Sequence, residues 1–439
     1  MLVLKFGGTS VGSPERMHAL AELLLSFDME GSNIVVLSAV AGTTNNLVAI
    51  SEALSNNEKE KANQLIESLF DQYKIFVDKL YSTEQGKGKG RELIENHFNF
   101  IRGFTQDMFT VHEEKIILAQ GELLSTALFH YYLQERQVSS VLLPALEFMR
   151  IDEDHEPVLE YISENLKKEV SKHTGSNLFI TQGYICRNAF GEIDNLKRGG
   201  SDYTATIIGA TVQSEEIQIW TDIDGMHNND PRIVDKTHPI AELSFDEAAE
   251  LAYFGAKILH PTCILPAQTR NIPVRLLNTM QPEAKGTVIT SKVSGDSIKA
   301  VAAKDGITAI KIKSGRMLLA YGFLRSVFEI FERYKTPIDM ITTSEVAVSL
   351  TIDNTKHLDA IKKELQGFCS VEVDTDQTIV CIVGNFSAAK QGFALRVFES
   401  LKNIPIRMIS YGGSENNISI LVDTKLKKDT LIALNKGVF

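Results

Sequence analysis

The last third of this 439-residue chain repeats itself, and the repeat restricts the possible folds more than any other feature of the sequence. Gly322-Phe323 recurs as Gly392-Phe393, 70 residues later, and the triplet Val327-Phe328-Glu329 recurs at the same offset. A shared register of this kind does not arise by chance, so this part of the chain contains two copies of one folding unit. Further pairs that keep the offset are Thr308 and Thr378, Ser344-Glu345 and Ser414-Glu415, Ser349 and Ser419, and Asp353 and Asp423.

The hydrophobic pattern of each copy predicts the order strand, helix, strand, strand, helix. The first copy adds a final strand, which completes the order of a ferredoxin-like βαββαβ unit. The second copy stops after its last helix, so we expect the two copies to share or exchange strands. A glycine turn before the first helix of each copy suits a small ligand held at a helix N-terminus, although a module that only dimerises fits the same pattern. The elements expected in the first copy are residues 308–313, 323–334, 338–341, 346–352, 357–365 and 369–373.

The N-terminal stretch predicts a strand that runs directly into an anion-binding turn. The apolar residues 2–4 indicate a buried parallel strand, Gly7 and Gly8 follow, and Ser13-Pro14 opens a helix as a cap with proline at the first helical position. Free backbone N–H groups and the helix dipole favour phosphate at such a place. Lys5, at the end of the strand, would direct its ammonium to the same point. From the glycines alone, an ordinary strand-to-helix turn explains the pattern equally well.

A second glycine turn of the same construction occurs at residues 198–202, Arg-Gly-Gly-Ser-Asp. It precedes another predicted helix, with Ser201 or Asp202 as the expected N-cap and Arg198 just outside. Turn geometry alone does not explain two such anion sites in one domain, so this pair favours phosphate binding. The chain contains neither a Walker A sequence nor a GxGxxG sequence, so any nucleotide must be bound without these two phosphate-binding motifs.

Two further features lie between these turns. The predicted strand at residues 33–40 ends in small and hydroxyl residues, at the strand edge where ligands bind in open α/β sheets. Residues 51–136 have helical periodicity, and Glu122 follows Gly121 among apolar neighbours. A carboxylate in such surroundings needs a cationic partner. A structural Lys or Arg would serve, and so would the ammonium group of a ligand.

Composition excludes several classes of protein. The formal net charge of −11 and the pI of about 5.5 argue against a nucleic-acid surface. The basic cluster at residues 87–91 is short and glycine-rich, and we expect it to be a solvated loop. The four cysteines are scattered without CxxC spacing, which fits a reducing compartment and no zinc site. No stretch is long enough to span a membrane, and the N-terminal apolar run carries Lys5, so we expect a cytoplasmic protein.

Taken together, these motifs resemble those of the aspartate kinase family, in its monofunctional, lysine-sensitive type, over essentially the whole chain. The resemblance implies an α/β amino-acid-kinase-like αβα sandwich with a mostly parallel sheet in residues 1–280, a connection at 281–304, and ferredoxin-like ACT modules at 305–375 and 376–439. The motifs that carry it are Lys5-Phe-Gly-Gly-Thr-Ser10, Gly121-Glu122, Arg198-Gly-Gly-Ser-Asp202, Trp220-Thr-Asp222, Phe254-Gly-Ala-Lys257 and the repeat.

The resemblance also implies roles for individual residues. Catalytic positions are Lys5, Gly7, Gly8 and Asp202, with Asp202 orienting Lys5. Aspartate-binding positions are Ser38, Thr44, Glu122, Arg198, Gly199 and Ser201. ATP-binding positions are Thr221, Asp222, His227, Arg232 and Lys257. Effector positions are Met317, Gly322, Leu324, Ile338, Thr343, Ser344 and Glu345. Two residues depart from the family pattern: His227 stands where relatives often have Tyr, and Ala320 stands where lysine-sensitive relatives often have Ser.

The implied reaction converts ATP and L-aspartate, with Mg²⁺ on the nucleotide, to ADP and 4-phospho-L-aspartate. This is the first step of lysine, threonine and methionine biosynthesis, with lysine as the expected inhibitor and a homodimer or dimer of dimers built through the ACT modules. Because a side-chain carboxylate is ionised at neutral pH, no general base is required, and catalysis rests on positioning and electrostatic stabilisation. The alternatives are another kinase of this fold, acting on glutamate, acetylglutamate or a nucleoside monophosphate, and a non-catalytic amino-acid sensor. Glu122 with Arg198 favours an amino acid with a free ammonium group.

Overall fold

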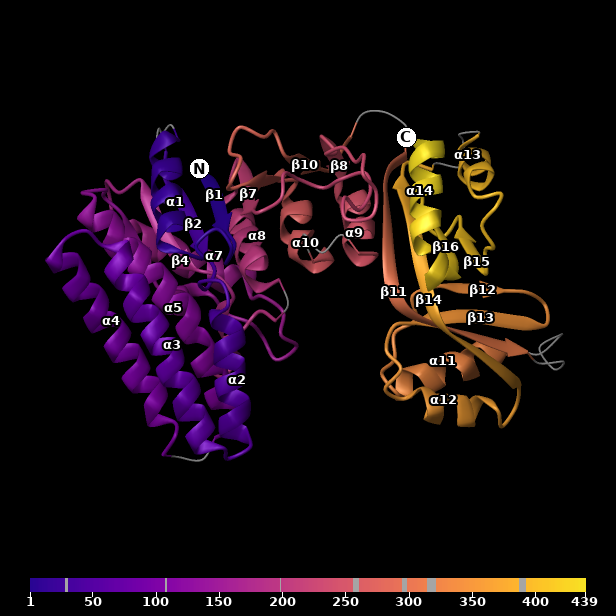
Figure 1. Cartoon of the computed structure of the whole chain (residues 1–439), viewed down its shortest axis with the longest axis horizontal. Coiled ribbons are helices and arrows are strands. Elements are labelled where there is room, and N and C mark those ends of the chain that lie inside the picture. The colour runs from indigo at the N-terminus through magenta and orange to yellow at the C-terminus, as the bar shows by residue number, and fades with distance from the viewer. Residues whose placement is uncertain are drawn as a thin grey trace. The chain divides into compact units, whose positions relative to one another are not determined.

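In a computed structural model, the chain divides into two compact units (Figure 1). The structure describes residues 1–27, 31–106, 109–197, 199–255, 260–293, 298–313, 321–386 and 392–439. The first unit consists of Met1–Met226, Ala241–Phe245 and Leu259–Lys292, and the second unit of His227–Ile240, Asp246–Ile258 and Val293–Phe439.

The first unit is built on an eight-stranded, mostly parallel sheet in the order β3-β4-β2-β1-β7-β9-β10-β8. Its central strands are mostly apolar and almost entirely buried, as expected for parallel strands covered on both faces. β10 is antiparallel to β9 and lies within the predicted connection, which therefore contributes a strand to this sheet. The strands are β1 (Leu2–Phe6), β2 (Asn33–Leu37), β3 (Val141–Leu143), β4 (Leu178–Gln182), β7 (Glu216–Thr221), β8 (Glu242–Ser244), β9 (Val274–Asn278) and β10 (Thr287–Thr290).

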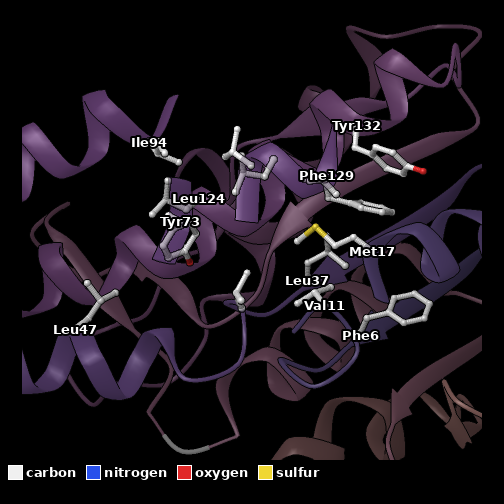
Figure 2. Close-up of a cluster of buried hydrophobic side chains, with 14 of the residues drawn as sticks. Phe6, Val11, Met17, Leu37, Leu47, Tyr73, Ile94, Leu124, Phe129 and Tyr132 are labelled. Atoms are coloured by element: carbon white, nitrogen blue, oxygen red, sulfur yellow. The ribbon is translucent and has the colours of Figure 1, made fainter. Parts of the chain in front are cut away.

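Four long helices, α2 to α5, lie side by side in this unit (Figure 1), which confirms the helical periodicity of residues 51–136. Phe6 of β1, Met17 of α1, Leu37 of β2 and Phe129 of α5 belong to one core cluster (Figure 2). In the described residues, none of the helices is both long and apolar enough to cross a bilayer. The remaining elements are the hairpin β5 (Ile185–Arg187) and β6 (Ile193–Asn195), and the helices α1 (Pro14–Ser26), α2 (Thr43–Ser55), α3 (Lys59–Leu80), α4 (Glu84–Gly103), α5 (Val111–Glu135), α6 (Ala145–Phe148), α7 (Leu159–Ser171), α8 (Gly200–Val212) and α10 (Pro261–Arg270).

The basic cluster at residues 87–91 is helical, so its prediction as a solvated loop is wrong. It lies in the first turns of α4, where Thr83 caps the helix by accepting a hydrogen bond from Gly86 N. Gly90 is buried against α3, and a Cβ atom there would lie 2.5 Å from Tyr81 Cε2. Glycine disfavours a helix by about 1 kcal/mol, but here it allows two helices to pack closely, and the packing decides the structure.

The second unit contains one six-stranded antiparallel sheet in the order β12-β13-β11-β14-β16-β15. Two strands, β11 and β14, run the length of both repeats and pair with each other throughout (Figure 1). The strands are β11 (Ile298–Lys313), β12 (Ile341–Thr343), β13 (Ala347–Ile352), β14 (Ser370–Gly384), β15 (Met408–Tyr411) and β16 (Asn417–Asp423). The helical elements are α9 (Phe245–Tyr253, of which Phe245 counts with the first unit), α11 (Phe323–Arg333), α12 (Leu358–Leu365), α13 (Phe393–Ser400), η1 (Thr424–Leu426) and α14 (Lys427–Val438).

The long strands show how the repeats share strands. The second half of β11 begins the first module, and the first half of β14 ends it. The second half of β14 begins the second module, and its missing last strand is the first half of β11, where Ala302 pairs with Cys381. Each module thereby has the βαββαβ content and strand order of a ferredoxin-like unit, as predicted. Each also has its own hydrophobic core.

Two glycines of α4 provide a matched test of this packing. Gly90→Ala should lower the free energy of unfolding of the first unit by about 1–2 kcal/mol, because its methyl group collides with Tyr81 and Val77. Gly88→Ala should raise it by about 0.5–1 kcal/mol, because Gly88 is exposed with no atom within 4 Å of the added Cβ. Urea unfolding followed by the fluorescence of Trp220, the single tryptophan, measures both. Equal shifts in the two variants would contradict the packing role.

Candidate functional site

Lys5 is a nearly buried cation close to the carboxyl end of β1. It is 9% exposed, and its Nζ lies 2.6 Å from Oδ1 of Asp202. Asp202 belongs to the first turn of α8, the helix that follows the second glycine turn. An uncompensated buried charge is costly, so this ion pair stabilises both groups in place. It also joins the two glycine turns that the sequence predicted.

The first glycine turn requires glycine for close approach. Gly7 N donates to the carbonyl oxygen of Trp220 on β7 at 3.2 Å. A Cβ atom on Gly8 would lie only 2.9 Å from the carbonyl oxygen of Ala39, in the loop after β2. The turn therefore lies against the ends of both neighbouring strands, at the carboxyl edge of the sheet where ligands bind in α/β folds.

The second glycine turn leaves the N-terminus of α8 free of side-chain capping. Gly199 is the N-cap, with φ of +71°, and a Cβ atom there would lie 2.7 Å from Cys263 Sγ. The prediction that Ser201 or Asp202 would be the N-cap is wrong, because both lie inside the first turn. Ser201 bonds instead to Ser38, after β2, and Asp202 to Lys5 of β1, and among the described residues no side chain accepts a hydrogen bond from the first N–H groups of α8. This is the arrangement that binds anions.

A chain of contacts connects these turns to Glu122. Ser201 Oγ donates to Ser38 Oγ at 3.2 Å, and Ser125 Oγ donates to the carbonyl oxygen of Ser38 at 2.8 Å. The next residue, Ala39, donates its N–H to Glu122 Oε1 at 3.2 Å. The structure thus brings Ser38, Glu122, Gly199, Ser201 and Asp202 to the sheet edge that carries Lys5, Gly7 and Gly8.

Glu122 is the most unusual group in this site. It is 2% exposed, and its Oε2 has no hydrogen-bond partner among the described residues. Burial raises the pKa of its carboxyl group to about 8, and the hydrogen bond from Ala39 opposes this only in part. The sequence allowed two kinds of cationic partner, a Lys or Arg of the chain or the ammonium group of a ligand. None of the described residues supplies a Lys or Arg to Oε2. An orphaned carboxylate oxygen of this kind fits the ammonium group of a ligand.

Sequence reasoning missed two supporting side chains. Ser125 contacts Ser38, and its position three residues after Glu122 on α5 places it on the same helix face. Tyr73 of α3 lies 2.8 Å, oxygen to oxygen, from Thr43 in the first turn of α2, next to the half-buried Thr44. The helical spacing could have revealed Ser125, but no local pattern points to Tyr73.

The predicted nucleotide residues are divided between the two units. Thr221 ends β7 at the same sheet edge as Lys5, and its Oγ1 donates to Asp222 Oδ1 at 3.1 Å. His227 and Arg232 belong to the second unit, where His227 Nδ1 lies 2.8 Å from Thr237 Oγ1 and the exposed Arg232 pairs with Asp230. Lys257 and the predicted aspartate ligand Arg198 lie outside the described residues.

The predicted effector residues belong to the first repeated module. Gly322 is the N-cap of α11, with φ of +86°, and the partly exposed Leu324 follows it. Ser344 N donates to the carbonyl oxygen of Ala347 at 2.8 Å and closes the turn between β12 and β13. Ile338 is half-buried, and Thr343, Ser344 and Glu345 are exposed; Met317 and the divergent Ala320 lie outside the described residues.

Comparisons with known proteins show which proteins the whole chain resembles. Residues 1–278 match the amino acid kinase family and residues 380–437 match an ACT domain. Lysine-sensitive aspartokinase 3 of Escherichia coli is 34% identical to this chain, and the alignment covers the whole of this chain and 99% of that protein. Aspartokinase 1 of Arabidopsis thaliana is also 34% identical, and the alignment covers the whole of this chain and 80% of that protein. Two crystal structures of E. coli aspartokinase III, each 33% identical, superpose along the whole chain. They are the complex with aspartate and ADP, the R-state, at a TM-score of 0.85, and the complex with lysine and aspartate, the T-state, at 0.81.

The burial of Glu122 predicts a pH-dependent stability of the unliganded protein. Because the pKa of its carboxyl group is raised to about 8 in the folded state, the unfolded chain ionises first as pH rises from 4.5. The free energy of unfolding of the wild type should therefore fall by about 1 kcal/mol per pH unit between pH 5 and 8, relative to that of Glu122→Gln. Urea unfolding across this range measures the difference.

Ser125→Ala is the matched control on the same helix. It removes a hydrogen bond to Ser38 but no titrating group. The difference in free energy of unfolding between this variant and the wild type should therefore be the same at every pH. Parallel curves for the wild type and Glu122→Gln would contradict the raised pKa.

Proposed function

Because this chain belongs to the aspartokinase family, it is a kinase that phosphorylates the side-chain carboxylate of aspartate under regulation through ACT modules, and we propose which of its residues do this. Residues 1–280 form the catalytic domain, 281–304 the connection, and 305–375 and 376–439 the ACT modules. The shared strands β11 and β14 run across the limits of both modules. The scattered cysteines, all four of which are free, support a cytoplasmic location.

Glu122 binds the α-ammonium group of aspartate. The single observation that carries this assignment is its buried, orphaned Oε2, on a carboxyl group whose other oxygen, Oε1, is linked through Ala39, Ser38 and Ser201 to the turn at α8. An ammonium group at Oε2 would satisfy that oxygen and favour the charged form of the carboxylate. Arg198 would hold the α-carboxylate through a bidentate pair. The remaining aspartate ligands are Ser38, Thr44, Gly199 and Ser201.

Lys5 stabilises the charge that develops on the phosphoryl group in transfer. Aspartate brings an ionised carboxylate to a polyphosphate, so the obstacle is repulsion between negative charges. Lys5, with the backbone N–H group of Gly8 and those at the start of α8, would offset that charge, and Gly7, whose N–H donates to Trp220, would hold the turn in place. Asp202 holds the Lys5 ammonium in position through the 2.6 Å ion pair.

ATP would be held by Thr221, Asp222, His227, Arg232 and Lys257, and it would bring Mg²⁺ on its phosphates as part of the substrate. The position of Thr221 at the end of β7 and of Asp222 directly after it, at the sheet edge that carries Lys5, supports this assignment. His227 in place of the tyrosine common in relatives would give the nucleotide a different contact.

Lysine is the proposed effector, and the enzyme is a homodimer or a dimer of dimers joined through its ACT modules. The effector residues are Met317, Gly322, Leu324, Ile338, Thr343, Ser344 and Glu345. The lysine-bound E. coli relative supports lysine, while Ala320, in place of the serine common in lysine-sensitive relatives, removes one possible hydrogen bond. A ligand acts on the enzyme only through unequal affinity for its active and inactive states.

Lys5→Ala tests the catalytic proposal. It should lower the rate of aspartyl phosphate formation by about 10²–10³-fold while ATP still binds, because Lys5 acts on the transition state and other groups hold the nucleotide. Lys61→Ala, at an exposed position on α3, is the surface control and should keep the wild-type rate. Near-normal turnover in a folded Lys5→Ala enzyme would refute the role of Lys5.

The repeat supplies a matched pair for the effector proposal. Glu345→Ala should raise the half-inhibitory lysine concentration by about tenfold with the uninhibited rate unchanged, because it removes an exposed carboxylate from the stretch proposed to bind a cationic ligand. Glu415→Ala, at the equivalent position of the second copy, should leave inhibition unchanged. Titrations of lysine, threonine and methionine are run separately, and indifference of the wild type to all three would refute feedback regulation.

A further inference from the structure

The loop between β2 and α2, residues 38–42, has a proposed aspartate ligand near each of its ends. Ser38 begins the loop, and Thr44 lies two residues after it, in the first turn of α2. The first end is bonded to α5, where Ser125 donates to the Ser38 carbonyl oxygen and Glu122 accepts from the N–H of the following residue. These two bonds come from one turn of α5, and they fix Ser38 relative to Glu122.

The second end of the loop is held by a different helix. Thr43, the first residue of α2, is 2% exposed, and its Oγ1 lies 2.8 Å from the hydroxyl oxygen of Tyr73 on α3. The N-cap before it, Gly42, has φ of +83° and provides no side-chain cap. The hydrogen bond between Thr43 and Tyr73 therefore ties the first turn of α2, which includes the half-buried Thr44, to α3.

Tyr73 is itself firmly held in the core of the first unit (Figure 2). It is 3% exposed, and the centre of its ring lies 5.7 Å from that of Phe98 on α4. Burial raises the pKa of the Tyr73 hydroxyl, and the nearby carboxylate of Glu122 raises it further. The hydroxyl thus stays protonated, and its hydrogen bond is kept at every pH at which the protein would work.

Gly121 brings α5 against both ends of the same loop. A Cβ atom on Gly121 would lie 2.9 Å from Cβ of Ala39 and 3.5 Å from Cγ2 of Thr43. The loop therefore packs directly on the main chain of α5, one residue before Glu122. With this contact on one side and the bond to Tyr73 on the other, the start of α2 has one favoured position.

We propose that Tyr73 is a positioning residue for aspartate, because through Thr43 it holds Thr44 in place. Thr44 then keeps a fixed distance from Ser38 and Glu122, and the proposal rests on the assignment of these three residues to aspartate. Without the bond, the first turn of α2 would sample other positions, and aspartate binding would have to restore one of them, at a cost in affinity. The proposed ATP ligands after β7 are separated from β2 by β1, so ATP affinity should not change.

Tyr73→Phe in the full-length enzyme is the direct test, because it removes the hydroxyl and keeps the ring. The KM for aspartate should rise by about fivefold, while kcat and the KM for ATP stay within about twofold of the wild type. Tyr81→Phe is the matched control. It removes a buried tyrosine hydrogen bond of the same length, to the carbonyl oxygen of Leu128, from the same core cluster. Its KM for aspartate should stay within about twofold of the wild type.

A double variant separates positioning from a general loss of stability. Tyr73→Phe leaves the Thr43 hydroxyl buried without a partner, and adding Thr43→Val removes that hydroxyl, so the free energy of unfolding should recover. The KM for aspartate should nevertheless stay within about twofold of that of Tyr73→Phe, because the bond is absent from both. A return of this KM to the wild-type value would overturn the proposal. So would an unchanged KM for aspartate in Tyr73→Phe, or equal rises for aspartate and ATP.

Glu122→Gln separates the proposal from the assignment on which it rests. This variant should raise the KM for aspartate by about tenfold or more, because it removes the charge that pairs with the ammonium group. A raised KM in Tyr73→Phe with an unchanged one in Glu122→Gln would remove Glu122 from the aspartate site and keep the positioning of Thr44. The reverse result would remove the positioning role and keep Glu122.

Discussion

The ion pair between Lys5 and Asp202 is the interaction on which the site depends. Lys5 must remain charged at the edge of a buried sheet, and loss of its partner would leave an uncompensated buried charge, at a cost of about 3–5 kcal/mol. Since Asp202 lies in the first turn of α8, the same bond fixes the helix N-terminus against β1. The glycines at both turns then allow close approach, of the Ala39 carbonyl oxygen at Gly8 and of the Cys263 side chain at Gly199, and they leave main-chain N–H groups for a phosphate beside Lys5.

The second unit contains more than the repeated modules. The loop at residues 227–240 is part of the second module: Val234 lies in that module's core, and Asn229 Nδ2 donates to the carbonyl oxygen of Leu431 on α14 at 3.1 Å. The end of α9 is held by the first module through Tyr253. The loop that carries His227 and Arg232, two of the proposed nucleotide ligands, therefore folds with the second module.

Sequence reasoning predicted most of the elements because each has a strong local pattern, and it found Lys5, Glu122 and Gly199 because each is chemically unusual for its surroundings. It failed where distant packing decides the outcome. The glycines near Lys89 suggest a loop, but the segment is helical because Gly90 allows α4 to pack closely against Tyr81. The missing last strand of the second copy predicts that strands are shared, but the sequence does not show which strand replaces it, because β11 is largely apolar in both halves and its partner is decided by closure of the sheet. Tyr253 and Asp339 are ordinary residues 86 positions apart, and only the fold brings them together.

The shared strands also determine the order in which the chain becomes stable during synthesis. The first half of β11 leaves the ribosome before the first module, but its partner, the second half of β14, follows only after that module is complete. Such long-range pairing is slow to form, and until then an unpaired strand edge is open to other chains. The second module can therefore close its part of the sheet only after the first module has been synthesised, and a nascent chain that stalls between them carries an exposed site for aggregation.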